Sequence, residues 1–598
     1  MLSALIACAP LYGCSDDGSG SQKEETSVTD AADSSADSTE KEEATEESKA
    51  DSNDAPQGDA SLDITLTAGN SWETNGEEFT DFQASVKASG NVSDWTATIP
   101  LKSDVEIISS WGGTFTVENS TIIVVPEDYN KALQSGNEAT FGFQIKGASD
   151  AVDTNAVSCS GTAGSTQQSQ AQNNSSSQSG STGGEAIVNT GAKDVPAPTT
   201  DDWLSVKGNK IVDSEGKEVW LTGCNWFGYN TGTNCFDGLW ACDLNSSLAS
   251  IADHGFNLLR IPISTELINN WADGQYPEAN YNNATNYYLE GMNSLEIFDY
   301  VVGQCRANGI KIMVDIHCAV TDSMGHMKPL WTDGDISEQD YLDGLSWMAD
   351  RYKNDDTIIA YDLKNEPHGK HNESPRAKWD DSKDADNWKY VAEKAADAVL
   401  SKNENALVMV EGIEIYPKDI KKNGDFASQN EDDYFYNWWG GNLRGVADNP
   451  LDLGKHQDKL VYSPHDYGPA VYEQPWFEGG YTFDSLYEDC WYDNWFYIQK
   501  KNIAPLLIGE WGGYMTEPNL TWMTYLRQLI SENKINHTFW CFNANSGDTG
   551  GLVKDDFMTW DTEKYEFVKE VLWQKDGKFV GLDHEIPLGE NGITLSDY

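Results

Sequence analysis

The chain has 598 residues, more than a single hydrophobic core normally organises, so two folded domains are expected. Its 97 acidic and 40 basic residues give a formal net charge of -57 at pH 7. Nucleic acid and anionic membrane surfaces would be repelled by this charge, which argues against both as partners. A neutral polymer is compatible with it.

The first 60 residues show two segments without a core. Residues 1–14 are a short apolar stretch, about half the length needed to cross a bilayer. Leu11–Cys14, followed by an acidic, Ser-rich stretch, resembles the processing site of bacterial lipoproteins, and Cys8 is a second candidate for the lipid-bearing residue. The alternative is the remnant of an ordinary secretion signal. Residues 15–60 predict a disordered acidic spacer. We therefore expect an extracellular protein, either secreted or anchored at the bacterial surface by lipid.

Residues 61–162 have the pattern of a small all-β module. Short alternating runs such as Leu62–Thr67 and Thr121–Val125 are separated by Gly, Asn and Ser turns, which predicts a β-sandwich. Trp72 and Trp111 stand in polar or glycine-flanked settings rather than inside apolar strands. Exposed aromatic rings in such settings suit sugar binding, because the apolar faces of pyranose rings stack on them.

The motifs of this module are similar to those of family 2 carbohydrate-binding modules. The matching stretches are Asn70–Trp72, Ser93–Trp95, Ser110–Thr114 and Gly136–Phe143. The resemblance implies that Trp72, Trp111 and Tyr129 form a flat cellulose-binding strip and that Trp95 is a core residue. The alternative for each strip residue is a buried aromatic. The family often joins the two ends of the module by a disulfide, whereas this module has only Cys159.

The remainder of the chain predicts a linker and a large α/β domain. Residues 163–200, rich in Ser, Gln, Gly, Thr and Asn, are typical of a flexible linker. Between 201 and 575, apolar runs alternate with amphipathic stretches, the pattern of parallel strands crossed by helices. The predicted strands are Val219–Asn225, Asn257–Ile263, Lys311–His317, Ile358–Glu366, Ala406–Gly412, Leu460–Tyr467, Leu506–Gly512 and His537–Asn543. Eight such units predict a (β/α)8 TIM barrel. Residues 576–598 form a tail without a clear role.

Polar residues gather at the carboxyl ends of these strands, where barrel enzymes keep their catalytic groups. They are Arg260, His317, Asn365, Glu366, His465, Tyr467, Glu510 and Trp540. Glu366 and Glu510 end the fourth and seventh strands, and two carboxyl groups facing one cleft are the minimum equipment for cleaving a glycosidic bond. The alternatives are that Arg260 only pairs with a buried carboxylate and that His317 and Trp540 are core residues.

Together these motifs are similar to glycoside hydrolase family 5, in particular its bacterial endoglucanases, over residues 203–575. The matching stretches are Leu221–Gly228, Gly238–Trp240, Leu259–Pro262, Asp362–Pro367, Trp438–Leu443, Tyr462–Tyr467, Ile508–Glu510 and Ser546–Gly551. The resemblance implies that Glu366 is the general acid/base, that Glu510 is the nucleophile, and that Asn365 holds the sugar 2-hydroxyl. It also implies retention of configuration through a covalent glycosyl-enzyme.

This chemistry sets conditions on the two glutamates. The nucleophile must stay ionised, so Glu510 is expected to contact Arg260 or the Tyr467 hydroxyl. The acid must be protonated near neutral pH, which partial burial of Glu366 and the charge of Glu510 would favour. Retention requires carboxyl groups roughly 5 Å apart. Trp240, Trp439 and Trp540 are the candidate stacking platforms for sugar rings.

No cofactor or metal is expected to take part in the chemistry. His317 and His465 are positioned to bind sugar hydroxyls or to tune the carboxylates, and neither belongs to a metal-like histidine cluster. The ten cysteines include no Cys-x-x-Cys pair, which argues against a structural zinc site. A disulfide between Cys235 and Cys318 is predicted, because both would lie near the cleft.

The sequence therefore predicts a retaining endo-β-1,4-glucanase that hydrolyses internal bonds of cellulose or a related β-glucan and acts as a monomer. Another β-glycanase specificity, for mannan, xyloglucan or mixed-linkage glucan, is the alternative among enzymes, because the same two glutamates serve all of them. From a different class, the alternative is a surface protein that binds glycan without cutting it.

Overall fold

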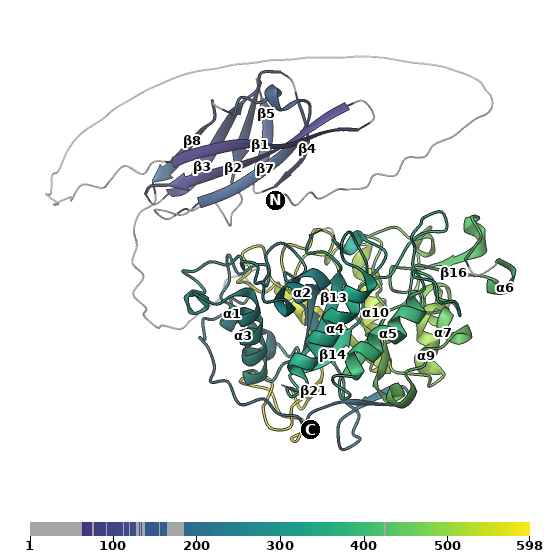
Figure 1. Cartoon of the computed structure of the whole chain (residues 1–598). Helices are drawn as coiled ribbons and strands as arrows, with labels where there is room; N and C mark the ends of the chain where they lie inside the picture. Colours follow the sequence, from purple (N-terminus) through teal and green to yellow (C-terminus); the bar gives the residue numbers. More distant parts are fainter. Residues whose placement is uncertain are drawn as a thin grey trace, which may run out of the picture. The chain divides into compact units, whose positions relative to one another are not determined.

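The computed structural model describes residues 62–163, with short gaps, and residues 184–598 except positions 324, 424 and 425. The chain divides into two compact units, a smaller amino-terminal one and a larger carboxyl-terminal one (Figure 1). Cys8, Cys14 and the predicted acidic spacer lie outside the described residues. Within the described ranges, no helix combines the length and the apolar character that crossing a bilayer requires.

The smaller unit is a β-sandwich of two four-stranded antiparallel sheets, as predicted. One sheet has the order β1-β2-β7-β4 and the other the order β5-β6-β3-β8. The strands are β1 (Leu62–Thr74), β2 (Glu77–Ala88), β3 (Val92–Pro100), β4 (Glu106–Trp111), β5 (Thr114–Glu118), β6 (Thr121–Val125), β7 (Glu138–Lys146) and β8 (Ser158–Ala163), with a short 3-10 helix η1 (Ser149–Ala151). Trp95 is buried and stacks on Phe141 at 5.8 Å, so its predicted place in the core is confirmed.

Two of the three predicted cellulose-binding aromatics belong to one sheet of the sandwich. In the backbone register, Trp72 of β1 pairs with Phe79 of β2, and Trp111 of β4 pairs with Gly142 of β7. Their side chains and the whole of Tyr129 lie outside what the structure describes. The strip that these three residues were predicted to form therefore stays a prediction.

The larger unit is a closed barrel of eight parallel strands, which confirms the predicted fold. Its strand order is β18-β15-β14-β13-β12-β11-β20-β19, and a parallel bridge between Tyr462 and Leu506 closes the ring. The strands are β11 (Thr222–Asn225), β12 (Leu258–Ser264), β13 (Lys311–Cys318), β14 (Ile358–Asp362), β15 (Leu407–Val410), β18 (Leu460–Tyr462), β19 (Leu507–Ile508) and β20 (Asn536–Phe539). The strands β14, β15, β18, β19 and β20 end before the predicted boundary, so the polar residues that follow them lie in the loops at the carboxyl end of the barrel.

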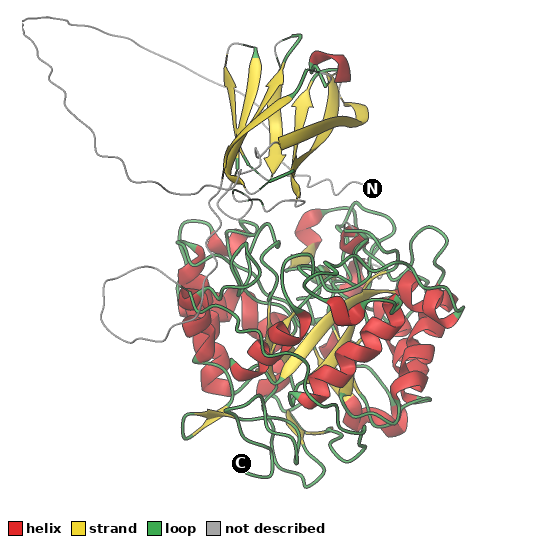
Figure 2. Cartoon of the chain, turned by 90° about the vertical axis from the view of Figure 1, so that its left-hand side faces the viewer, coloured by secondary structure: helices red, strands yellow, loops and turns green. Residues whose placement is uncertain are grey.

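Helices surround these strands (Figure 2). The α-helices are α1 (Leu244–Asp253), α2 (Thr265–Ala272), α3 (Ser294–Ala307), α4 (Glu338–Tyr352), α5 (Trp388–Leu400), α6 (Ile420–Asn423), α7 (Gly445–Asp448), α8 (Phe483–Leu486), α9 (Tyr497–Lys500), α10 (Asn519–Asn533) and α11 (Thr562–Lys569), and a π-helix, η7 (Tyr487–Phe496), joins α8 to α9. Asn293 and Ser337 begin α3 and α4 with capping boxes, which satisfy backbone N–H groups that the first turn leaves unpaired. The buried faces of these helices pack on the barrel.

Segments from both ends of the larger unit close the amino-terminal end of the barrel. The hairpin β9 (Ser205–Lys207) and β10 (Lys210–Val212) precedes the first barrel strand, and the hairpin β21 (Gln574–Lys575) and β22 (Lys578–Phe579) follows the last helix. Three buried residues of the predicted tail, Val580, Leu582 and Leu595, share one apolar cluster with the barrel strands. Residues 576–598 are therefore part of this domain, and treating them as a separate tail was wrong.

The last part of the predicted linker also contacts the barrel. The carbonyl of Glu185 accepts a hydrogen bond from the Trp560 amide at 2.9 Å, and the carbonyl of Thr199 accepts one from the Asp356 amide at 3.0 Å. Residues 184–200 thus lie along the barrel surface, and the linker prediction was too long at this end.

Short two-stranded and 3-10 elements complete the loops: β16 (Ile415–Pro417), β17 (Tyr434–Tyr436), η2 (Tyr287–Leu289), η3 (Gly325–Met327), η4 (Glu431–Asp433), η5 (Gly454–Lys459) and η6 (Pro475–Phe477).

The predicted disulfide between Cys235 and Cys318 is wrong, because both residues are free thiols. The sulfur of Cys235 donates to the Asn280 carbonyl at 3.3 Å, whereas that of Cys318 donates to the Asn230 carbonyl at 3.5 Å. Each thiol is therefore bonded to a different backbone carbonyl, and both are buried. Burial raises the pKa of Cys318 to about 12, so its thiol stays protonated and unreactive.

Candidate active site

The two predicted catalytic glutamates lie together at the carboxyl end of the barrel. Glu366 follows β14, and Glu510 follows β19, where an isolated parallel bridge pairs it with His465 in the loop after β18. The Nδ1 of His465 lies 2.9 Å from the Oε1 of Glu366 and 3.6 Å from the Oε2 of Glu510. One oxygen of each carboxylate and one ring nitrogen of His465 all lie within 4.8 Å of one another. This spacing fits double displacement, for which carboxyl groups roughly 5 Å apart are typical.

Both oxygens of Glu510 accept hydrogen bonds from the partners that the sequence predicted. The Nη1 of Arg260 donates to Oε1 at 2.7 Å, and the hydroxyl of Tyr467 donates to Oε2 at 2.6 Å. Burial raises the pKa of Tyr467 well above its usual value, so this hydroxyl keeps its proton and remains a donor. Two fixed donors, one of them charged, hold the Glu510 carboxylate in one orientation and stabilise its charge.

Glu366 differs electrostatically from the expectation. Burial raises the pKa of its carboxyl, but the hydrogen bond and positive charge of His465 outweigh burial and lower that pKa below its usual value. The pKa of His465 is raised well above its usual value: burial lowers it, and Glu411, Glu510 and Glu366 together raise it by more. The expectation that burial and Glu510 would keep Glu366 protonated was therefore wrong for the free enzyme. Both shifts favour a protonated His465 beside an ionised Glu366 in the free enzyme.

Arg260 connects several residues of the candidate site to one another. Its buried guanidinium contacts Glu510 as above and also donates to Asn225 (3.0 Å), Asp362 (3.0 Å), Asn365 (3.1 Å) and Glu411 (3.4 Å), with Asp315 at 3.1 Å as an ion pair. The alternative that Arg260 pairs with buried carboxylates is thus also correct. Because the Oδ1 of Asn365 accepts from Arg260, the amide nitrogen of Asn365 is left to donate toward a substrate.

His317 and Trp540 form one wall of the site. Burial lowers the pKa of His317 well below its usual value, so the ring is neutral, and its Nδ1 lies 2.7 Å from the Oδ2 of Asp315. The rings of His317 and Trp540 are stacked, with centroids 5.7 Å apart and 6° between their planes. Trp540 also stacks on Phe227 at 5.5 Å and donates its indole N–H to Ser546 at 3.1 Å. These contacts fix the orientation of the Trp540 ring. Because Trp540 is only partly buried, part of the ring remains accessible.

The two other predicted platforms are supported by different neighbours. Trp439 is partly buried and stacks on His368 at 3.8 Å with 7° between the planes, and the Nδ1 of His368 lies 2.7 Å from the carbonyl oxygen of Glu366. Trp240 is 40% exposed and rests edge-on against Phe557 at 5.5 Å. Trp439 is therefore connected through His368 to the loop that carries Glu366, whereas Trp240 is more open to solvent.

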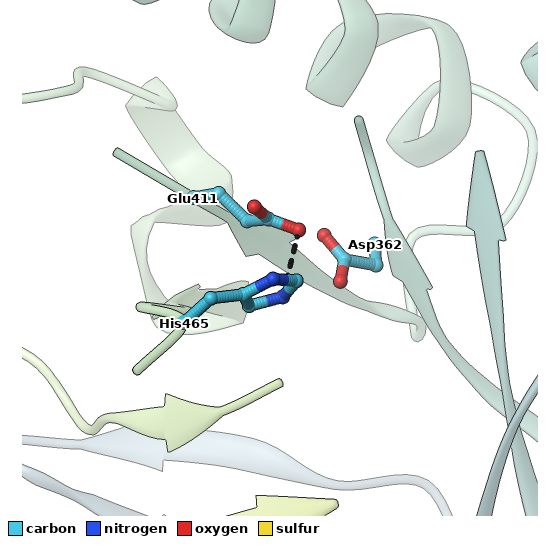
Figure 3. A group of neighbouring side chains, drawn as sticks. All are labelled: Asp362, Glu411 and His465. Carbon is cyan, nitrogen blue, oxygen red and sulfur yellow. Dashed lines mark ion pairs between the residues drawn. The ribbon is translucent and has the colours of Figure 1, made fainter. Parts of the chain in front are cut away.

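The sequence reasoning missed a group of buried charges below the two glutamates. It comprises Asp315, Asp362, Lys364 and Glu411, all fully buried. Figure 3 shows Asp362 and Glu411 beside His465, with oxygen and nitrogen atoms close enough to suggest a metal site. The guanidinium of Arg260, bonded to both carboxylates, supplies the positive charge there instead. A signal was present, because Glu411 ends the fifth apolar run just as Glu366 ends the fourth.

Comparisons with known proteins agree with this geometry. Residues 212–546 match the model of the cellulase family, glycosyl hydrolase family 5, and residues 63–164 match that of a cellulose binding domain. The chain is 52% identical to "Endoglucanase G" of Acetivibrio thermocellus over 431 residues, which covers 67% of this chain and 76% of the relative. It is 46% identical to "Endoglucanase B" of the same organism over 435 residues, covering 67% and 77%.

Solved structures give the same result for the barrel. The catalytic domain of the major endoglucanase from Xanthomonas campestris is 30% identical, with a TM-score of 0.54, and the match covers 62% of this chain and 99% of that one. A cellotetraose complex of the endocellulase from Pyrococcus horikoshii is 31% identical, with a TM-score of 0.55, covering 62% and 98%. The chain therefore belongs to glycosyl hydrolase family 5 and carries a family 2 cellulose binding domain.

Proposed function

We propose that the protein is a retaining endo-β-1,4-glucanase that hydrolyses internal bonds of cellulose or a related β-glucan. In this proposal Glu366 is the general acid/base and Glu510 is the nucleophile. The observation that carries it is the pair of carboxylates within 4.8 Å of one another, with Arg260 and Tyr467 bonded to one of them. The names of the relatives support a β-glucan as the substrate.

In the first step, an oxygen of Glu510 attacks the anomeric carbon and the bond to the leaving sugar breaks. Glu366 gives its proton to the leaving oxygen, so the departing chain has a free hydroxyl and the first half remains as a glycosyl ester of Glu510. As negative charge leaves Glu510, the hydrogen bond from Tyr467 is free to weaken. The Asn365 amide, oriented by Arg260, donates to the sugar 2-hydroxyl during this step.

In the second step, Glu366 acts as a base. It takes a proton from water, whose oxygen attacks the anomeric carbon and releases Glu510 as a carboxylate. Two inversions at one carbon retain the original configuration. The neutral ring of His317 and the indole of Trp540 form the wall against which the sugar lies.

The proton for the leaving oxygen comes from the pair of Glu366 and His465. In the free enzyme the raised pKa of His465 keeps it on the ring, 2.9 Å from Glu366. The Glu366 side chain keeps 13% of its surface exposed, and a bound glucan would remove that water. Removing water disfavours the two opposite charges relative to the neutral pair. Substrate binding therefore moves the proton along the hydrogen bond to Glu366, which delivers it.

Export and anchoring belong to the same proposal. We infer that the protein acts outside the cell as a monomer, either secreted or anchored at the bacterial surface by lipid at Cys14 or Cys8. A relative 32% identical over 372 residues is named the "Major extracellular endoglucanase" of Xanthomonas campestris, which supports export. Labelling cells with a fatty-acid analogue tests the anchor: loss of label in Cys14→Ala identifies that cysteine, loss only in Cys8→Ala identifies the other, and no label at all would leave simple secretion.

The deciding experiment measures reducing ends released from carboxymethylcellulose by the wild type, Glu366→Gln and Glu510→Gln. Glu532→Gln, a change at an exposed helical position, is the matched control. Activity that both catalytic variants lose and the control keeps supports the proposal, and NMR of the first product then reports the retained anomer. Glucomannan and xylan are assayed beside it. Activity confined to either would keep the mechanism and change the substrate, whereas no activity with intact binding would support a glycan-binding protein.

A further inference from the structure

Glu411, the residue after β15, contacts both Glu366 and His465. Its Oε2 accepts a hydrogen bond from the backbone N–H of Glu366 at 2.7 Å. Its Oε1 lies 3.1 Å from the Nε2 of His465 and 3.4 Å from the Nη2 of Arg260. Figure 3 shows the carboxylate facing the imidazole, with the ion pair as a dashed line. The side chain of Glu411 is fully buried, so these contacts are shielded from water.

The hydrogen bond to Glu366 holds an uncommon backbone conformation. The φ angle of Glu366 is +52°, in the left-handed region that residues other than glycine rarely adopt. Gly440, with φ of +69°, passes directly over the same carboxylate, and a Cβ there would lie 2.1 Å from the Oε2 of Glu411. The chain is thus built to admit Glu411 beneath the acid/base. A carboxylate in this position fixes where the Glu366 side chain leaves the backbone.

His465 forms the second connection. One ring nitrogen faces Glu411 and the other faces Glu366, so the imidazole bridges the two carboxyl groups. Burial raises the pKa of Glu411 to about 8, so the charge of this carboxyl depends on pH near neutrality. When Glu411 is ionised it stabilises the proton on the ring, and a neutral group there favours release of that proton. The charged and titratable groups that face Glu411 are Arg260, Asp362, Lys364, Glu366 and His465.

We propose that Glu411 is a positioning residue for the proton-transfer step: it orients Glu366 through the backbone and, through His465, sets which member of that pair holds the proton. This inference rests on the proposed function. In this inference Glu411 affects the action of Glu366 as acid/base and not that of Glu510 as nucleophile. A purely structural residue would affect both.

The test compares two substrates that differ in how much they need an acid. Cellotetraose has a sugar leaving group that must be protonated, whereas 2,4-dinitrophenyl β-cellobioside releases a stable anion without help. The parameter kcat/KM reports the glycosylation step for both. For Glu411→Gln we expect kcat/KM on cellotetraose to fall roughly 100-fold, in the range that general acid catalysis contributes. On the dinitrophenyl substrate we expect kcat/KM close to that of the wild type.

Activity on the dinitrophenyl substrate also shows that the variant is folded. If Glu411→Gln is insoluble, Glu411→Asp, which retains the carboxyl group on a shorter side chain, is compared in the same way. Asp380→Asn, a buried carboxylate bonded to Asn387 and Ser382, is the matched control and should lower neither value. Equal losses on both substrates, or no loss on cellotetraose, would overturn the inference. A wild-type protein that cleaves neither substrate would instead refute the proposed function.

Discussion

The hydroxyl of Tyr467 donates a hydrogen bond of 2.6 Å to the Oε2 of Glu510, on the side of the carboxylate opposite Arg260. A carboxylate with a donor on each oxygen is oriented before substrate arrives, as the proposed role of Glu510 as nucleophile requires. The donors also stabilise the carboxylate when it leaves the sugar in the second step, because its charge returns at that moment.

Replacing Tyr467 by Phe should therefore lower kcat on cellotetraose roughly 100-fold, the lower end of what loss of one such donor costs. Affinity should change little, because the hydroxyl bonds the enzyme's own carboxylate. Steady-state kinetics of the purified variant measure both. Tyr416→Phe is a suitable control, since the Tyr416 hydroxyl also donates to a carboxylate, that of Asp448, at 2.8 Å. A rise in KM with unchanged kcat would show that the hydroxyl of Tyr467 binds sugar instead.

Most of the site geometry was predictable because parallel strands bring their carboxyl ends to one edge of a barrel. Glu366, Glu510 and the partners Arg260 and Tyr467 all stand at such ends, so their spacing in the sequence was enough to place them together. The protonation of Glu366 was not predictable in this way. It depends on His465 contacting both glutamates and Glu411, which only the three-dimensional arrangement of the loops after β14, β15 and β18 decides.

The buried aspartates and the segment 576–598 were also not predictable from the sequence, because their burial depends on residues distant in the chain. The residues Asp315 and Asp362 lie inside strands, where a sequence pattern reads them as interruptions of an apolar run, and only the position of Arg260 explains their burial. The segment 576–598 lacks the periodicity of a helix or a long strand. Its leucines are buried by the open end of the barrel, a surface that exists only once all eight strands are in place.

The closure of the barrel by this segment predicts a stability effect. Leu582 is 1% exposed and packs in the apolar cluster at the amino-terminal end. Leu582→Ala should lower the free energy of unfolding by about 2 to 5 kcal/mol, the usual cost of such a cavity. Guanidinium unfolding followed by tryptophan fluorescence measures it. Ile503→Ala, at a position 46% exposed, should cost much less. Equal effects would mean that the segment adds no stability to the domain.

His537 predicts a specific dependence of stability on pH. Burial lowers its pKa to about 4, and its Nδ1 accepts a hydrogen bond from Trp511 at 3.1 Å. Because the folded pKa lies below the unfolded one, neutral His537 favours folding above about pH 6.5, and this stability is lost as the pH falls toward 4. Between about pH 7.5 and 5 the loss amounts to about 2 kcal/mol.

The variant His537→Gln removes this titration and offers an amide to the same partners. Its unfolding free energy should therefore fall less than that of the wild type over the same acid range. Unfolding curves collected at both pH values give the difference directly. Parallel pH dependences in the two proteins would show that His537 charges without cost in the folded state.

The cellulose binding domain predicts a separation between binding and hydrolysis. Trp111 ends β4, in the sheet that also contains Trp72. If its ring stacks on glucose units, Trp111→Ala should weaken binding to insoluble cellulose about 5- to 150-fold, as loss of roughly 1 to 3 kcal/mol of ring stacking implies. Hydrolysis of cellotetraose should be unchanged, because that substrate reaches the barrel without help. Pull-down isotherms on microcrystalline cellulose and rates on cellotetraose measure the two effects. Loss of both to the same degree would show that Trp111 supports the fold of the chain rather than a binding surface.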